Sequence, residues 1–372
     1  MAERWDVIVT GLGAMGSAAA RELARRGLRV LGLDRYAPPH AHGSTHGRTR
    51  IIREAYFEHP AYVPLVQRAE RLWVELEREV GERLFVRTGG LMIGSEDGEL
   101  VRGARASAEE HGLPHELLTS GDVRRRFPGL APEPDTVALL EPRAGVLFPE
   151  ACVRGMLSSA ARHGADLRPG EPMLTWRAER GEVRVATAIG EHVADRLVLT
   201  LGPWLPEFLN GAQIQLTIER QMQHWFTPRA NAEEFSPDNL PIALWETADR
   251  MFYTIPDFGD GVKIAVHHDG ESTDPQRVRR TINEQEDASA RALVQRFLPD
   301  AAGELRDRAV CLYTNTADQH FVIDHHPLHH EIVIASPCSG HGFKFATVVG
   351  EIVARLAADE PVEGLSLFHC RG

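Results

Sequence analysis

The sequence predicts an α/β protein in which a parallel-sheet domain is interleaved with a second domain built on an antiparallel sheet. The chain opens with a strand, a glycine-rich turn, a helix and a second strand within its first 33 residues, which form a compact βαβ unit. Residues 213–226 and 241–267 are rich in alternating β-forming residues, which is typical of an antiparallel sheet. Short buried strands at 195–202 and 332–335 return to the α/β pattern. The two kinds of sheet therefore alternate along the chain.

Local spacing and stop signals place the remaining elements. The opening unit is predicted as strand, turn, helix and strand over 5–10, 11–16, 17–26 and 28–33. A turn followed by a strand is predicted over 87–94, and further helices are predicted over 62–80, 98–117, 150–163, 276–297 and 345–356. We expect a discontinuous first domain, formed by 1–82, 142–210 and 308–372, and a second domain formed by 83–141 and 211–307.

Composition narrows the class of protein. A chain of 372 residues with 43% hydrophobic content can bury the cores of two domains. Its net charge of -12 argues against a nucleic-acid partner. No apolar run reaches the length of a membrane span, and the N-terminus lacks the pattern of a signal peptide, so we expect a cytoplasmic protein. The four cysteines include no CxxC pair, which fits neither a disulfide framework nor a zinc site, and no metal is expected.

The first glycine turn matches the GxGxxG pattern of dinucleotide-binding folds. Gly11 permits a tight turn, Gly13 lets the backbone approach a pyrophosphate, and Gly16 allows the following helix to pack on the strand. Asp34, at the end of the second strand, can accept hydrogen bonds from a ribose. This context favours a Rossmann-type unit over a structural turn with a surface aspartate. The turn does not distinguish FAD from NAD.

A basic segment follows the second strand. His46, Arg48, Arg50 and Arg53 lie within eight residues, and two isoleucines between the last two arginines indicate partial burial. Buried arginines need anionic partners, for which a pyrophosphate and a substrate carboxylate are the candidates. A solvated basic loop explains the local sequence equally well.

Longer motifs of the chain resemble the monomeric sarcosine oxidase family, which includes N-methyltryptophan oxidase. They are His46-Gly-x-Thr49-Arg50-Ile-Ile-Arg53-x-Ala-Tyr56, Tyr62-Val-Pro-Leu, Gly145-Val-Leu-Phe148, Tyr253-x-x-Pro256, Lys263-x-x-x-His267, Cys311-Leu-Tyr313-Thr314, His320-Phe-x-Ile-Asp324 and Ser339-Gly-His-Gly-Phe-Lys344-Phe345. The resemblance implies a fold like that of p-hydroxybenzoate hydroxylase, with one FAD between a Rossmann-type domain and an antiparallel-sheet substrate domain. It also implies oxidation of a secondary amine by O2, which converts sarcosine into glycine, formaldehyde and hydrogen peroxide.

The glycine turn and the resemblance together imply a set of cofactor-binding residues. They are Gly11, Gly13, Met15, Gly16, Asp34, Arg35, Ser44, His46, Thr49, Arg50, Met173, Gly202, Cys311, Gly340, Gly342, Phe343 and Lys344. Cys311 matches the cysteine that tethers the flavin through an 8α-thioether, a reaction of the thiolate that neighbouring cations favour. Cys338 is the alternative tether, but Tyr313 and Thr314 match the family motif together with Cys311.

The resemblance also implies catalytic roles. By the period of two in a strand, Lys263 and His267 point to one face. Lys263 matches the lysine that contacts flavin N5 through water and promotes reaction with oxygen, while His267, Tyr253 and Tyr313 match substrate-pocket residues. Arg53 and Lys344 match the pair that holds the substrate carboxylate. Two cations in one pocket repel each other, so we expect an anion from outside to join them when substrate is absent.

Several alternatives stay open on the sequence. Trp245 is expected near the wall of the pocket, and if it faces inward the pocket is narrow and fits sarcosine. If it faces away, N-methyltryptophan or another larger secondary amino acid could fit, as could pipecolate or proline. The histidines of 325–330 surround a proline and fit no standard zinc spacing, which predicts a solvated turn. A nicotinamide dehydrogenase would be colourless, and a non-catalytic flavoprotein would be yellow but inert towards amines. We expect a monomer, as is common in the family.

Overall fold

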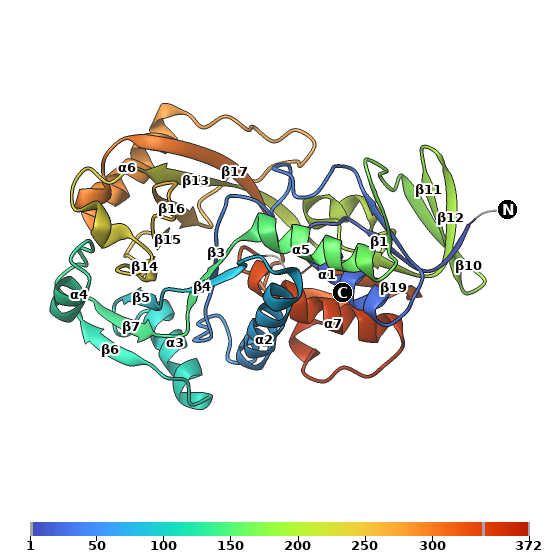
Figure 1. Ribbon diagram of the computed structural model, residues 1–372, viewed down its shortest axis with the longest axis horizontal. Helices are drawn as coiled ribbons and strands as arrows, with labels where there is room; N and C mark the ends of the chain where they lie inside the picture. Colours follow the sequence, from blue (N-terminus) through green and yellow to red (C-terminus); the bar gives the residue numbers. More distant parts are fainter. Residues whose placement is uncertain (1–2, 337–338, 371–372) are drawn as a thin grey trace.

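The computed structural model describes residues 3–336 and 339–370, so the alternative tether Cys338 lies outside the described residues. The chain forms two large sheets and one small sheet, and the two large sheets lie at opposite ends of the molecule (Figure 1). Among the described residues, no helix combines the length and the apolar character needed to cross a membrane.

The first sheet is the predicted dinucleotide-binding unit. Its centre is parallel, in the order β19 (His329–Ser336), β12 (Gly190–Leu199), β1 (Arg4–Thr10), β2 (Val30–Asp34) and β9 (Asp166–Pro169). Antiparallel strands extend it: β11 (Glu182–Thr187) pairs with the first half of β12, β10 (Thr175–Glu179) pairs with β11, and β18 (Val322–His326) pairs with β19. The side chains of β1 alternate between two cores, because Val7 and Val9 face the helices and Ile8 faces the opposite side.

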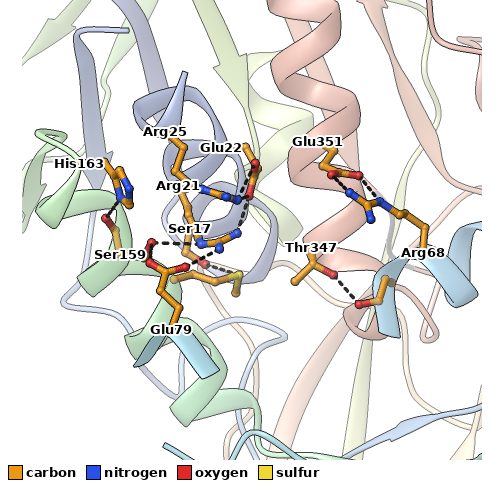
Figure 2. Close-up of polar contacts among 12 residues, drawn as sticks. Ser17, Arg21, Glu22, Arg25, Arg68, Glu79, Ser159, His163, Thr347 and Glu351 are labelled. Carbon is orange, nitrogen blue, oxygen red and sulfur yellow. Dashed lines mark hydrogen bonds and ion pairs between the residues drawn. The ribbon is translucent and has the colours of Figure 1, made fainter. Parts of the chain in front are cut away.

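Three helices cover one face of this sheet, α1 (Ala14–Arg25), α5 (Pro149–Arg162) and α7 (Ala346–Ala357), and α2 (Tyr62–Val80) packs on α5 and α7. Ion pairs and hydrogen bonds join them, as Figure 2 shows. Arg21 of α1 donates to Ser159 of α5 at 3.1 Å and to Glu79 of α2 at 2.6 Å. Arg68 of α2 donates to Glu351 of α7 at 2.9 Å. The helical layer therefore holds the glycine turn before α1 at a fixed place.

The second sheet has eight strands. Their order is β17 (Leu305–Asn315), β13 (Thr217–Phe226), β16 (Val262–His267), β15 (Met251–Ile255), β14 (Ile242–Glu246), β5 (Gly90–Gly94), β7 (Val137–Glu141) and β6 (Glu116–Thr119). The antiparallel pattern predicted for 213–226 and 241–267 is confirmed, and the β5–β14 pair is parallel. The long helix α6 (Glu284–Phe297) packs on the outer face of this sheet, over Phe226, Phe252 and Ile264.

A small sheet brings segment 50–58 to the space between the large sheets. It pairs β3 (Arg50–Ile52) and β4 (Phe85–Arg87) with β8 (Gly145–Leu147). The remaining helices are α3 (Glu99–Glu110), α4 (Ser120–Arg126) and the short 3-10 turns η1 (Gly202–Phe208), η2 (Ala232–Phe235), η3 (Pro299–Ala301), η4 (Phe343–Phe345) and η5 (Ser366–Phe368).

Two predicted helices were too long. The helix predicted over 98–117 ends at Glu110, because Gly112 adopts a left-handed conformation (φ +60°) and Pro114 follows; residues 116–119 form β6 instead. The helix predicted over 276–297 begins only at Glu284. Asn283 accepts a hydrogen bond from the backbone N–H of Glu286, and this capping box fixes the start. The helix predicted over 62–80 has the observed bounds of α2.

Candidate active site

A long cavity lies between the two large sheets and has an empty volume, including the solvent at its mouth, of about 1890 Å³. Its walls come from the turn after β1, the end of β2, the segments before and after β3, and η1 on one side. Strands β14, β15, β16 and β17 and the turn before α7 form the other walls. Segments far apart in the sequence therefore meet at one site.

The glycine turn forms one end of the cavity. Gly11 has φ +85°, and a Cβ atom on Gly16 would overlap the carbonyl oxygen of Gly11, so both positions require glycine. The nearest atom to a Cβ on Gly13 would be Thr45 Oγ1 at 3.7 Å, which leaves room for a ligand there. Asp34 accepts the backbone N–H groups of Leu12 at 2.6 Å and Tyr36 at 2.8 Å. Its carboxylate also lines the cavity.

Three buried polar atoms on the cavity wall have no hydrogen-bond partner among the described residues. They are Ser44 Oγ, Trp204 Nε1 and Gln223 Oε1. Unpaired buried polar atoms are rare in folded proteins, and each of these can pair with a polar group of a bound molecule. The cavity is therefore suited to an extended ligand that carries polar groups along its length.

Cys311 is buried in β17, opposite Gln221 of β13, and its side chain reaches the cavity. The side-chain amide of Gln223 donates to Cys311 Sγ at 3.1 Å. Gln223 thus touches the sulfur with its nitrogen while its oxygen lacks a partner. A ligand that bonds to this sulfur would lie within reach of that free oxygen.

Lys263 lies beside this wall in β16. Its Nζ donates to the backbone carbonyls of Gly47 at 2.9 Å and Thr49 at 3.1 Å and lies 5.1 Å from the ring centre of Trp225. Burial, followed by the charge of Arg50, lowers the pKa of Lys263 well below its usual value. The alternation along β16 is as predicted, because Val262 and Ile264 pack under α6 on the opposite face.

Arg53 lies at the other end of the cavity, 3% exposed. Its guanidinium forms two hydrogen bonds of 2.7 Å with the carboxylate of Glu58, and it lies 4.3 Å from the ring centre of Tyr56. Burial acts to raise the pKa of Glu58, but the charges of Arg53, His341 and Lys344 and the hydrogen bonds from Arg53 together outweigh it and lower that pKa to about 2. The anion expected from outside is therefore supplied by the chain itself, because Glu58 follows Arg53 closely enough to fold back on it.

Lys344 lies at the same end as Arg53. Its Nζ donates to the carbonyl of His341 at 2.7 Å and to Tyr56 Oη at 3.4 Å. Burial and the charge of Arg53 lower the pKa of Lys344 to about 7, against the opposite effect of Glu58. Two positive groups and one negative group therefore share this end of the cavity, which leaves it with an excess of positive charge near neutral pH.

Aromatic and histidine side chains form the wall next to these cations. His267 Nδ1 lies 3.3 Å from Tyr313 Oη, and Tyr253 also faces the cavity. Burial lowers the pKa of His267 well below its usual value, so its ring is neutral at pH 7. Burial raises the pKa of Tyr253 and Tyr313, so both keep their hydroxyl protons.

Trp245 faces away from the cavity. Its ring stacks on Phe252 with 5.6 Å between ring centres and packs against Phe297 in the core under α6. The neighbouring residue on β14, Leu244, lines the cavity instead, together with Met251. Of the two orientations that the sequence left open, the structure has the one that leaves more room for a substrate.

Most of the residues expected at the site line this one cavity, and three do not: Gly16, His46 and Lys263. Gly16 acts in packing, and Lys263 lies behind Thr49. His46 is buried, and burial with the charges of Arg50 and Lys263 lowers its pKa to about 3. The sequence analysis missed several lining residues, among them Phe57, Glu58, Trp204, Gln223 and His341. Two of them carried a signal, since His341 stands inside the motif of residues 339–345 and Gln223 shares a strand face with the buried Trp225.

The histidines of 325–330 divide between two faces of the β18–β19 hairpin. His326 is buried, and its Nε2 lies 2.6 Å from the carbonyl oxygen of Leu209. His325 and His330 stack on the other face, where His330 Nε2 lies 2.9 Å from Asp359. The side chains of His325, His330 and Asp359 lie close enough together to hold a metal ion. Asp359 also forms an ion pair with Arg196 at 2.7 Å, so the charge of its carboxylate is already balanced.

Comparison with known proteins agrees with this geometry. The family model described as FAD dependent oxidoreductase matches residues 6–356. The chain is 44% identical over 362 residues to monomeric sarcosine oxidase from Streptomyces avermitilis, across 96% of this chain and 94% of that protein. It is 32% identical over 360 residues to N-methyl-L-tryptophan oxidase from Yersinia pestis (strain Pestoides F), across 96% of each chain.

Solved structures share the fold. NikD, an amino acid oxidase essential for nikkomycin biosynthesis, superposes with a TM-score of 0.86 at 24% identity, across 99% of this chain and 98% of that one. Glycine oxidase from Geobacillus kaustophilus superposes with a TM-score of 0.83 at 18% identity, with the same coverage. The α/β fold expected from the sequence is confirmed. The chain therefore belongs to the FAD-dependent oxidoreductase family and is an FAD-dependent amine oxidase that acts on CH–NH donors.

Proposed function

We propose that this protein oxidises sarcosine with O2 and releases glycine, formaldehyde and hydrogen peroxide. The observation that carries the proposal is that Arg53 and Lys344 both lie at one end of the cavity, beside the neutral His267 and the hydroxyl of Tyr313. A cation pair selects a carboxylate, and a neutral wall leaves space for an uncharged amine. The relatives named as sarcosine oxidases support the same substrate class.

The residues present fit FAD. The Gly11–Gly16 turn leaves open space at Gly13 for a pyrophosphate, and Asp34 has lone pairs that face the cavity. The unpaired Ser44 Oγ and Gln223 Oε1 can accept or donate to the polar edges of the cofactor. We propose a covalent thioether between Cys311 Sγ and the flavin, because Cys311 is the cysteine that lines the cavity among the described residues.

The mechanism begins with the carboxylate of the substrate. Glu58 occupies Arg53 when the substrate is absent, so the carboxylate joins or replaces this pair. The bound substrate arrives as an ammonium zwitterion and must lose a proton before the C–H bond breaks. Arg53 and Lys344 disfavour a further cation nearby, which lowers the pKa of the amine. We therefore expect the rate of substrate oxidation to rise with pH.

The chemistry that FAD supplies when bound is the acceptance of hydride from the N-methyl carbon and the later delivery of two electrons to O2. The protein holds the methyl group in place through its grip on the carboxylate at the other end of the molecule. Water then hydrolyses the imine product, and the sum is sarcosine, O2 and H2O converted into glycine, formaldehyde and H2O2. The ammonium of Lys263 stabilises the negative charge that develops on oxygen.

A larger N-methyl amino acid is the second candidate substrate. The orientation of Trp245 away from the cavity favours it, because the wall there consists of Leu244 and the partly exposed Met251. An aliphatic leucine and a flexible methionine can yield to a bulky side chain more easily than an indole can. N-methyl-L-tryptophan oxidase is among the relatives at 32% identity.

We propose further that the protein acts as a monomer in the cytoplasm. The relatives named as monomeric oxidases support the oligomeric state. We also propose the domain division expected from the sequence. Sheet membership supports it for β14, β15 and β16, which belong to the antiparallel sheet, and for β1 and β2, which belong to the parallel one. The structure differs from it at residue 308, because β17 continues through this boundary and pairs with β13 in the antiparallel sheet.

The test is an absorption spectrum before and after acid precipitation, followed by anaerobic addition of sarcosine, N-methyl-L-tryptophan or pipecolate. We expect yellow colour in the pellet and bleaching by sarcosine at the lowest concentration. Colour in the supernatant would remove the role of Cys311 as tether and leave the fold intact. Bleaching only by N-methyl-L-tryptophan or only by pipecolate would replace sarcosine as the substrate. A holoenzyme that none of these amines bleaches would contradict the proposed reaction.

A further inference from the structure

A buried carboxylate lies directly behind the segment that carries Arg53. Glu141 ends strand β7 and is 1% exposed. One of its oxygens accepts the backbone N–H of Glu54 at 2.7 Å, and the other accepts the backbone N–H of Ala55 at 2.9 Å. A single side chain therefore satisfies two consecutive amides of a loop, and both bonds are charge-assisted.

These two amides follow Arg53 immediately in the chain. The carbonyl of Ala55 accepts a hydrogen bond from Arg53 Nη1 at 2.9 Å. The backbone of Ala55 is thus held by Glu141 through its N–H, and it holds the guanidinium of Arg53 through its C=O. The plane of the guanidinium against Tyr56 and Phe57 depends on where this residue lies.

Burying the carboxylate of Glu141 is unfavourable unless its oxygens are paired, and the two backbone amides provide this pairing. Burial raises the pKa of Glu141 to about 7, although the two amides and the charge of Arg53 act against this rise. Glu54 is the other charged group that faces it, and Glu54 lies 3.1 Å from Arg143 on its far side. A neutral glutamine would cost less to bury, but its amide nitrogen cannot accept the second N–H.

We propose that Glu141 is a positioning residue, which holds the Glu54–Ala55 backbone so that the guanidinium of Arg53 faces the substrate carboxylate. This inference rests on the proposed function in one respect, the role of Arg53 as carboxylate ligand. It adds a connection between the antiparallel sheet and the segment that follows the small sheet. Glu141 belongs to the antiparallel sheet, and Arg53 follows β3 of the small sheet. A residue of one sheet therefore sets the orientation of a carboxylate-binding side chain next to another sheet.

The test compares Glu141→Gln with Glu70→Gln. Glu70 is 3% exposed, lies in the same region and contacts Arg87 and Arg143, but it accepts no backbone N–H of 54 or 55 among the hydrogen bonds of the described residues. Both variants remove one buried carboxylate. We expect Glu141→Gln to raise KM for sarcosine by at least about tenfold, with kcat changed less than about threefold, because one charge-assisted bond to the loop that positions Arg53 is lost and none at the reacting carbon. Glu70→Gln should leave KM unchanged.

A second measurement does not depend on turnover. Acetate carries a carboxylate and no amine, and its binding to the holoenzyme can be followed by the change in flavin absorption. We expect Glu141→Gln to weaken acetate binding by the same factor as it raises KM, and hydrogen exchange at the amides of Glu54 and Ala55 to become faster. If Glu141→Gln does not fold, Glu141→Asp, which keeps the charge on a shorter side chain, should show the same changes to a smaller extent.

The outcomes separate the two proposals. Equal effects of Glu141→Gln and Glu70→Gln on KM and on acetate binding would overturn the positioning role, and so would a Glu141→Gln enzyme with normal values of both. A wild-type holoenzyme that oxidises no N-methyl amino acid, but loses acetate binding on Glu141→Gln, would contradict the proposed function and leave the positioning role supported.

Discussion

Three buried cations dominate the candidate site, and each is stabilised in a different way. Lys263 is held by two backbone carbonyls, Arg53 by the carboxylate of Glu58, and Lys344 by the carbonyl of His341. A carbonyl dipole compensates a buried charge less fully than a carboxylate does. Burial lowers the pKa of both lysines, and the charge of Arg50 adds to this effect at Lys263 and that of Arg53 at Lys344.

Replacing Lys263 by methionine should separate the two halves of the reaction. The substitution keeps the length of the side chain and removes the charge that stabilises reduced oxygen. We expect the reaction of the substrate-reduced enzyme with O2 to slow by at least about a hundredfold, in keeping with the loss of one electrostatic stabiliser. Anaerobic reduction by sarcosine should change far less. Stopped-flow absorbance measures both rates, and equal slowing would remove the assigned role.

The affinity for a carboxylate should fall as pH rises through about 7, where Lys344 loses its proton. Below that pH its ammonium joins Arg53 in attracting the anion, and above it only Arg53 remains charged. Glu58 and His341 keep their charge states in this range, because the pKa of Glu58 is lowered to about 2 and that of His341 to about 4. Acetate titration of the holoenzyme measures the effect.

Lys344→Arg is the matched control for this pH dependence, because arginine stays protonated. It should abolish the loss of affinity on the alkaline side. Any weakening on the acid side should persist, since protonation of Glu141, whose pKa burial raises to about 7, is independent of Lys344. Identical pH profiles in the wild type and in Lys344→Arg would contradict the assignment.

At the scale of elements, the turn between β1 and α1 illustrates how one motif serves two purposes. Gly16 is required by packing, because an added Cβ would overlap the Gly11 carbonyl oxygen. Gly13 borders open space, and the nearest atom to an added Cβ would be Thr45 Oγ1 at 3.7 Å. The pattern of glycines therefore combines a folding constraint with a binding constraint.

Alanine substitutions at these two glycines should have different outcomes. Gly16→Ala should yield little folded protein, because the backbone of the turn and the helix cannot separate without breaking the sheet contact. Gly13→Ala should fold but bind FAD more weakly, since its methyl group enters the space left for the cofactor. Circular dichroism and the flavin content of the purified proteins distinguish them. A normal flavin content in Gly13→Ala would show that the cofactor does not approach this turn.

The bounds of a helix were predicted well where a local sequence pattern sets them, and less well where a capping residue sets the start of the helix. The helix over 62–80 has an uninterrupted apolar stripe and ends at a left-handed glycine, and both signals are local. The segment before α6 also has helical spacing, but Asn283 and Glu286 cap the helix at a later residue. Residues 276–282 lie outside the helix, where Arg279 and Thr281 offer their carbonyls to the buried Arg220.

At the scale of the whole molecule, FAD would bind between the two large sheets and contact both. Its binding therefore stabilises the folded chain by mass action. The variant Cys311→Ser allows the cofactor to be removed and added back. We expect the stability of this apoprotein to rise by about 2.7 kcal/mol when FAD is present at a hundred times its Kd.

Differential scanning calorimetry at increasing FAD concentration measures this effect. NADH at the same concentrations is the control, because a nicotinamide dehydrogenase would show the opposite preference. A thermal midpoint that is independent of FAD would mean that the cofactor does not bind across the two sheets, whatever the fate of the covalent bond.

The sequence by itself determined the order of the elements, the dinucleotide turn, and the common face of Lys263 and His267. These features depend on residue types at short, regular spacing, so that periodicity and glycine conformation are sufficient to predict them. The tertiary structure alone decided that Glu58 pairs with Arg53, that Glu141 holds the loop behind it, and that Trp245 turns away from the cavity. The contact of Glu58 with Arg53 depends on the path of an irregular loop. The contacts of Glu141 and the orientation of Trp245 depend on how strands far apart in the chain pack together. No local sequence pattern encodes the path of that loop or this packing.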